Sequence, residues 1–171
     1  IPASGITLSN AASDAASVRL LARSAMTVLC RADGGFGGPV TETAPPRPYP
    51  GRPADLMHTI TTLPQQGLIY RLSGDVNPLH ADPQVARSAG FERPILHGLA
   101  TFGLVGRAVA EVAPAAHPGR GLHFLRGRFL APVYPGDKLL VELWNQEDGW
   151  TLRASVPGRE TVVFGNGFAR A

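Results

Sequence analysis

The sequence is poor in cysteine: Cys30 is the only one among its 171 residues. A single cysteine forms no disulfide within the chain, so a small scaffold held together by disulfides is excluded. One thiol also cannot build a zinc site whose ligands are cysteines. This composition fits a reducing compartment, and we expect the protein in the cytoplasm.

Long apolar runs are missing as well. No segment approaches the roughly 18 consecutive apolar residues of a membrane span, so we expect no membrane attachment. The start, IPASGITLSN, lacks Met and the charged and apolar regions of a signal peptide. We therefore expect further sequence before Ile1 in the native protein. The final residues, GFARA, do not resemble a Ser-Lys-Leu address for the peroxisome, which favours the cytoplasm.

Charge is scarce too. Charged residues make up 17% of the chain, and the formal net charge is only +3. So small and scattered an excess does not favour nucleic acid as a partner. Hydrophobic residues make up 44%, which is typical of a globular core and excludes a disordered chain.

The chain divides into three stretches by composition. Residues 1–40 hold short apolar runs and end in the glycine-rich loop GGFGGP at 34–39. Residues 41–55 contain five prolines, which exclude a regular helix or a central strand and indicate a linker that crosses the surface. Residues 56–171 have the pattern of one complete domain.

Helix signals come first within that domain. Asn77 followed by Pro78 is typical of an N-cap and first helical residue, so a short helix or turn begins there. Residues 81–90 predict a second short helix that Gly90 ends. Residues 97–112 predict the long helix, with an apolar face described by spacings of three and four. That face consists of Leu99, Phe102, Val105, Val109 and Val112.

Strand signals follow the long helix. Turn residues separate four segments with strand composition, at 121–133, 138–146, 150–156 and 161–169. A run of strands after a helix predicts an α+β fold with an antiparallel sheet, not a parallel one.

Chemistry concentrates between Tyr70 and Asp82, in YRLSGDVNPLHAD. The carboxylate of Asp75 and the imidazole of His80 stand five residues apart across a turn that Pro78 stiffens. We expect such a turn to bring both side chains to one small pocket and to hold them with little freedom, as catalysis requires.

This motif resembles that of the MaoC-like (R)-specific 2-enoyl-CoA hydratases and dehydratases. The phrase AGFERPILHGLATFG at 89–103 is similar to the second signature of that family, and PVYPGDKL at 132–139 to its strand-turn-strand. The loop at 34–39 with the proline-rich segment resembles the junction of family members that contain two hot dogs. The resemblance covers roughly residues 25–171, and two motifs in the correct order make it specific.

The resemblance implies a hot-dog fold, in which a curved antiparallel sheet wraps a long central helix. It implies that residues 56–171 form the catalytic hot dog, and that residues 1–40 are part of a second, catalytically silent one whose own helix lies outside this chain. We expect two hot dogs to pair, as a homodimer or as a pseudo-dimer within a longer chain, because pairing covers an exposed sheet edge.

The resemblance also implies the roles of four residues. Asp75 and His80 are the catalytic acid/base pair, and Asn77 and the backbone N–H of Gly98 bind the thioester oxygen as an oxyanion hole. A helix N-terminus suits that task because it offers unpaired N–H groups. The implied reaction is the hydration of trans-2-enoyl-CoA to (R)-3-hydroxyacyl-CoA, or its reverse, with no metal and no other cofactor.

Several alternatives remain open. Asp75 and Asn77 resemble the start of a calcium loop, but His80 stands where such a loop needs glycine. Asp75, His80 and His97 are a possible metal set without the spacing of a helical zinc motif. His97 either binds substrate or anchors the start of the helix, and we favour the anchor.

Rival functions also remain. The first is a dehydratase acting on acyl chains bound to a carrier protein, and the second is thioester hydrolysis. A third, from a different class, is a non-catalytic subunit that binds acyl thioesters. Four basic residues are possible contacts for the phosphates of coenzyme A, none of them singled out: Arg93, Arg126, Arg128 and Lys138.

Overall fold

The structure is a computed structural model that describes residues 3–13, 20–31, 47–112 and 121–171. The chain divides into two compact units, Ile1–Ala44 and Pro45–Ala171. The division falls after Ala44, so the proline-rich segment groups with the second unit. Among the described residues, none of the helices has the length and apolarity that crossing a membrane requires.

The first unit contains two paired strands. Strand β1 (Ala3–Ser13) runs antiparallel to β2 (Leu20–Arg31), with Ala3 opposite Arg31. The side chains of residues 20–28 are all exposed. A two-stranded pair buries little by itself and is marginal in water. The assignment of residues 1–40 to a second hot dog stays a prediction, and part of that range lies outside the described residues.

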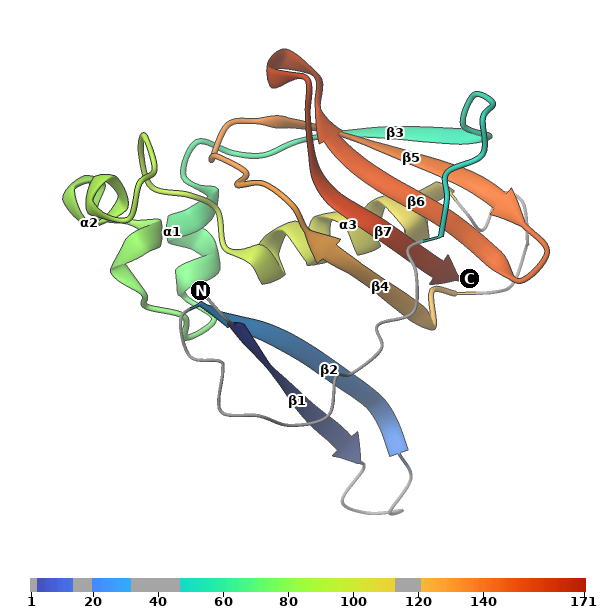
Figure 1. Cartoon of the computed structure of the whole chain (residues 1–171), viewed down its shortest axis with the longest axis horizontal. Helices are drawn as coiled ribbons and strands as arrows, with labels where there is room; N and C mark the ends of the chain where they lie inside the picture. The colour runs from blue at the N-terminus through green and yellow to red at the C-terminus, as the bar shows by residue number, and fades with distance from the viewer. Residues whose placement is uncertain (1–2, 14–19, 32–46, 113–120) are drawn as a thin grey trace. The chain divides into compact units, whose positions relative to one another are not determined.

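The second unit is an antiparallel sheet with one long helix. The sheet contains five strands in the order β3-β5-β6-β7-β4, and α3 lies along it in Figure 1. The elements follow one another as β3 (Leu56–Thr61), α1 (Gln66–Arg71), the 3-10 helix η1 (Pro78–His80), α2 (Pro83–Ser88), α3 (Gly98–Val112), β4 (Phe124–Phe129), β5 (Lys138–Gln146), β6 (Gly149–Val156), the 3-10 helix η3 (Pro157–Arg159) and β7 (Thr161–Arg170).

The predicted helices and strands of this unit are confirmed with small shifts of their ends, except that the segment predicted at 121–133 is a strand only over β4, Phe124–Phe129. The hairpin between β5 and β6 illustrates why the turn residues mark them. Gly149 has φ +144°, which a side chain rarely adopts, and a Cβ there would lie 2.4 Å from the carbonyl oxygen of Ala169. Two further elements, β3 and α1, were not predicted from the sequence.

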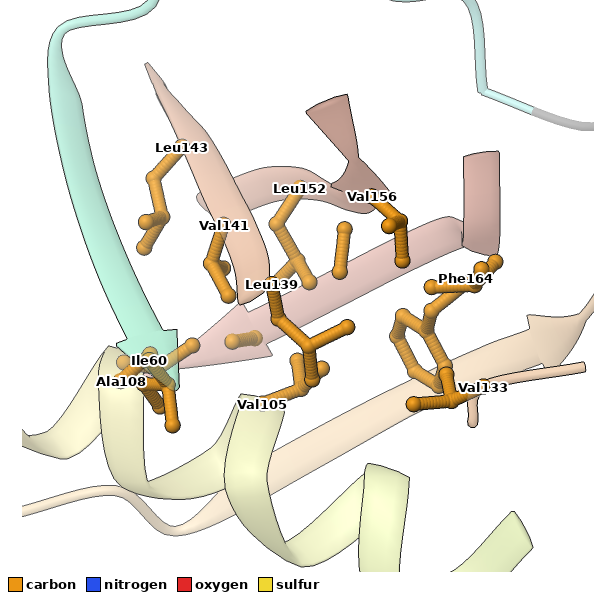
Figure 2. Close-up of a cluster of buried hydrophobic side chains, with 14 of the residues drawn as sticks. Ile60, Val105, Ala108, Val133, Leu139, Val141, Leu143, Leu152, Val156 and Phe164 are labelled. Atoms are coloured by element: carbon orange, nitrogen blue, oxygen red, sulfur yellow. The ribbon is translucent and has the colours of Figure 1, made fainter. Parts of the chain in front are cut away.

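The core lies between α3 and one face of the sheet (Figure 2). Val105 and Ala108 from the helix meet Leu139, Val141 and Leu152 from the strands, and all five are fully buried. Burying an apolar side chain of this size stabilises the fold by about 1.5–3 kcal/mol. The core therefore fixes α3 against the sheet.

The assignment of one residue, Leu99, to the buried face of the predicted helix is wrong. Val105 and Val109 are fully buried, whereas Leu99 is 54% exposed. Leu99 and Val105 are six residues apart, the sum of two steps of three. At 3.6 residues per turn, six residues place the side chain of Leu99 about 120° around the helix axis from that of Val105. The spacing rule thus fails at the first turn of α3, and Leu99 faces outward.

The proline-rich segment is fastened to the sheet. The hydroxyl of Tyr49 accepts a hydrogen bond from the backbone N–H of Asn166 at 3.0 Å, and its ring lies 5.4 Å from that of Trp144. The indole N–H of Trp144 donates to the carbonyl of Arg52 at 2.9 Å. Residues 49 and 52 are therefore bonded to the sheet, and the prediction of a linker at 41–55 stays a prediction, since residues 41–46 lie outside the described residues.

Candidate active site

The loop that carries the motif starts at the end of α1. Gly74 has φ +106°, a conformation that glycine adopts without strain, and it turns the chain into Asp75. The Asp75 side chain is exposed, and its Oδ1 accepts a hydrogen bond from the N–H of Asn77 at 3.3 Å. This local bond holds the carboxylate beside the turn.

Asn77 and Pro78 begin η1, as the sequence predicts. The Oδ1 atom of Asn77 accepts from the N–H of Leu79 at 3.0 Å, and Pro78 fixes the first helical φ. Because Oδ1 is engaged, the amide is oriented and its Nδ2 group keeps its donors for other partners. His80 is the last residue of η1.

The imidazole of His80 is oriented by a backbone carbonyl. Its Nδ1 atom lies 2.8 Å from the carbonyl oxygen of Ile95. A carbonyl oxygen only accepts, so Nδ1 carries the hydrogen and donates it. In the neutral ring, Nε2 then has a free lone pair and is able to accept a proton.

His97 contacts both Asp75 and His80. It is 1% exposed, and its Nε2 atom lies 3.2 Å from the carbonyl oxygen of Asp75. Its ring stacks on that of His80 at a centroid distance of 3.7 Å and an interplanar angle of 27°, and it lies 4.7 Å from the ring of Tyr70. Side-chain atoms of Asp75, His80 and His97 lie within 4.8 Å of one another.

Burial lowers the pKa of His97 below its usual 6.5, because the charged ring is poorly solvated there. The bond to the Asp75 carbonyl opposes this shift, and the neighbouring His80 adds to it. His97 is therefore neutral at pH 7. Its Nδ1 atom is buried and contacts no hydrogen-bonding group in the described part of the chain.

Gly98 begins α3 directly after His97. The N–H of a first helical residue has no acceptor within its helix, and the helix dipole makes this end attractive to negative charge. A Cβ on Gly98 would lie 3.2 Å from the ring of Phe129. Glycine therefore leaves room between this backbone and the aromatic side chain.

The segment 95–98 is held to the core through its second residue. Leu96 is 3% exposed, and its N–H donates to the carbonyl of Val133 at 2.7 Å. Its neighbours Ile95 and His97 present a carbonyl and a ring to the motif, and Gly98 begins α3. Only Leu96 faces the hydrophobic core.

A small cavity of about 190 Å³ adjoins His80. Its wall includes the guanidinium-bearing Arg93, which donates to the carbonyl of Pro135 at 3.0 Å and lies over the ring of Tyr134. Apolar side chains stand exposed nearby in sequence, with Leu72 at 87% and Val76 at 61%. Of the four predicted site residues, His80 alone lines this cavity.

Asp75, His80 and His97 are also possible ligands of a metal ion. The two imidazoles lie face to face, so the in-plane lone pairs do not converge on a shared point as zinc ligands do. One nitrogen of each ring already bonds to a carbonyl. The arrangement supports proton transfer better than metal binding, and the expected lack of a metal or cofactor stays a prediction.

All four predicted site residues lie in this neighbourhood. Asp75, Asn77 and His80 share the loop, and Gly98 follows the histidine that contacts two of them. Their roles remain predictions. The carbonyl of Ile95 was missed, since a backbone acceptor leaves no mark in the sequence. For His97 the sequence left two roles open, substrate binding or anchoring the helix start, and favoured the anchor.

Known proteins resemble this chain over most of its length. It is 41% identical to the 3-hydroxyacyl-thioester dehydratase Y of Mycobacterium tuberculosis over 150 residues, which cover 86% of this chain and 51% of that protein. It is 40% identical to the peroxisomal multifunctional enzyme type 2 of Drosophila melanogaster over 162 residues, or 92% of this chain and 27% of that enzyme. The chain thus spans about half the length of these relatives, or less.

Solved structures agree with the fold. The Drosophila enzyme superimposes with a TM-score of 0.82 over 98% of this chain and 30% of its own, at 36% identity. The (R)-hydratase from A. caviae superimposes with a TM-score of 0.55 over 71% of this chain and 96% of its own, at 25% identity. The predicted hot-dog fold is confirmed.

A family model supports the same assignment. The MaoC like domain matches residues 46–162, which is more than half of the chain and includes every residue of the site described above. The chain therefore belongs to the MaoC-like dehydratase family.

Proposed function

We propose that the chain catalyses the (R)-specific hydration of trans-2-enoyl-CoA to (R)-3-hydroxyacyl-CoA, or the reverse dehydration. One observation carries this proposal: side-chain atoms of Asp75 and His80 lie within 4.8 Å of one another, and the Nδ1 atom of His80 lies 2.8 Å from the Ile95 carbonyl, which orients the imidazole. Relatives named as enoyl-CoA hydratases and an (R)-hydratase structure support it.

Asp75 and His80 hold one water between them. One of the pair removes a proton from this water, and a proton is delivered to the substrate. The water oxygen bonds to the β-carbon of the enoyl group, the carbon–carbon double bond becomes single, and a proton goes to the α-carbon on the same face. During this step negative charge grows on the thioester oxygen. The N–H of Gly98 and the Nδ2 group of Asn77 stabilise it, and one such donor is worth about 3–4 kcal/mol of barrier.

This chemistry consists of proton transfer and stabilisation of an oxyanion. We therefore propose that neither a metal ion nor a redox cofactor takes part. Purified chain treated with a chelator should keep its full rate, whereas loss of activity that added Zn²⁺ restores would contradict this proposal.

The test is the loss of absorbance at the enoyl-thioester band after addition of crotonyl-CoA or a longer analogue. Asp75→Asn and His80→Gln should each lower kcat by about 10²- to 10⁴-fold, as expected when a general acid or base is removed. Glu92→Gln and His123→Gln change the same groups at exposed positions and should leave kcat unchanged. Full activity in either motif variant would refute its assignment, and an (S) product would refute the stereochemistry.

A relative named 3-hydroxyacyl-thioester dehydratase favours a second candidate, dehydration of acyl chains bound to a carrier protein. The site chemistry is the same, and only the carrier differs. Comparison of kcat/KM for crotonyl-CoA and crotonyl-carrier protein distinguishes the two, since the physiological carrier should give the higher value.

The pairing of hot dogs remains part of this proposal. This chain covers 51% and 27% of two of its relatives, which leaves room in them for a second hot dog in one chain, and a homodimer is the alternative arrangement. Sedimentation that shows a single hot dog as a stable monomer would contradict both. The cytoplasm remains the proposed compartment, and the location of a fluorescent fusion tests it.

A further inference from the structure

His97 has no part in the reaction described above, yet it contacts both members of the catalytic pair. It is 1% exposed, so none of its atoms faces a space that substrate occupies. Its environment does not favour charge either. A buried neutral imidazole between two functional groups raises the question of what it holds in place.

The hydrogen bonds define its tautomer. The carbonyl of Asp75 only accepts, so the Nε2 atom of His97, 3.2 Å away, carries the ring hydrogen and donates it. Nδ1 then has the free lone pair, which agrees with its having no partner among the described residues. The ring thus ties the backbone of Asp75 to the residue that precedes α3.

The stacking contact restrains His80. The bond from His80 Nδ1 to the Ile95 carbonyl fixes one atom of the imidazole but leaves the ring free to pivot about that bond. The ring of His97, at 3.7 Å and nearly parallel, covers one face and blocks the pivot. Ile95 and His97 are two residues apart, so one short segment supplies both restraints.

We propose that His97 is a positioning residue, a neutral Nε2–H imidazole that holds the Asp75 carbonyl and supports the face of His80, and so sets the separation of the acid/base pair. This role rests on the proposed hydratase function. It differs from that of a catalytic residue, since His97 acts only through its two neighbours. It differs from a helix anchor too, since the bond to α3, from the N–H of Thr101 at 3.1 Å, goes to the backbone carbonyl of His97 and not to its ring.

Three substitutions separate the two contacts. His97→Phe keeps a ring for the stack and removes the donor. His97→Gln places an amide nitrogen where Nε2 was and removes the ring. His97→Asn is too short to reach and loses both contacts.

We expect kcat to fall about 10-fold in the Phe and Gln variants and about 100-fold in the Asn variant, the scale of a misplacement near 1 Å. KM should stay within about twofold, because the buried ring does not touch substrate. Equal kcat in wild type and His97→Asn would overturn the proposal. An effect on KM alone would also overturn it. So would a Gln variant whose kcat is no higher than that of the Asn variant when both have the same Tm.

A second measurement needs no activity and no variant. In ¹⁵N-labelled chain at pH 7, NMR of the histidine rings should show His97 as neutral Nε2–H and His80 with its hydrogen on Nδ1. The opposite tautomer, or a charged His97, would overturn the proposal even if every variant misfolds. A chain that shows these tautomers but does not hydrate enoyl-CoA would refute the proposed function alone.

Discussion

Gly127 gives the sharpest prediction for stability, because the space for its side chain is already filled. It lies at an irregularity in the pairing of β4 with β7. A Cβ there would lie 2.0 Å from Cζ, 2.3 Å from Cε1 and 2.8 Å from Cε2 of Phe164. Carbon atoms in contact prefer about 3.5–4.0 Å, so in Gly127→Ala the ring must retreat by more than about 1 Å.

Phe164 has no free space to enter. It is fully buried, and its ring makes edge contacts with Phe102 and Phe129 at 6.1 and 5.9 Å between centroids. Overpacking a core costs about 1–3 kcal/mol, and we expect the upper end because the clash is with three ring atoms. At about 4 °C per kcal/mol, Tm should fall by about 12 °C for a unit of this size.

The double variant tests the cause. Phe164→Leu removes the ring and is destabilising by itself, but in that background Gly127→Ala should add less than about 1 kcal/mol, because the clash is gone. Thermal unfolding followed by circular dichroism gives all four Tm values. If the two losses simply add, the ring is not what makes Gly127 necessary and the reasoning is refuted.

Two further predictions concern α3 and the buried histidine. Gly103→Ala should raise stability by about 0.5–1 kcal/mol and leave kcat unchanged, because a Cβ there meets nothing within 4 Å and glycine weakens a helix interior; a lower Tm would contradict this. The pKa of His97 is lowered in the folded chain, so as the pH is lowered through 6.5 the unfolded chain binds more protons than the folded one. The free energy of unfolding should therefore decrease as the pH is lowered there, by at most about 1.4 kcal/mol per pH unit from this group. Urea titrations of wild type and His97→Phe at pH 7 and 5.5 check the sign, and an unchanged pH dependence in the variant would refute it.

Much of the fold was predictable because local signals mark it. Alternating apolar residues and turns such as Glu147-Asp148-Gly149 identify β5 and β6, and the Asn77-Pro78 pair identifies η1. The missed strand β3 alternates in burial, but its sequence hides the alternation, because Met57 points outward at 64% exposure and His58 is partly buried. It is a sheet edge whose register with β5 is a long-range contact, and single-sequence patterns do not encode such contacts.

The site was predictable as far as side chains mark it. Recognisable sequence motifs contain all four predicted residues, Asp75, Asn77, His80 and Gly98. The Ile95 carbonyl that orients His80 belongs to the backbone, so any residue type at that position supplies it. The stack of the two imidazoles depends on a separation of 17 residues that only the folded chain closes.

The position of Leu96 between Ile95 and His97 has a consequence for how this site tolerates change. The carbonyl of Ile95, the ring of His97 and the amide of Gly98, which we propose to bind the thioester oxygen, lie within four consecutive residues, and Leu96, the member of the four in the hydrophobic core, holds them to Val133. The hydrogen bond from Leu96 to Val133 thus sets the place of all three groups at once. Inserting or deleting one residue between 95 and 98 would change their mutual spacing, whereas substitutions on the exposed side of α3 would not.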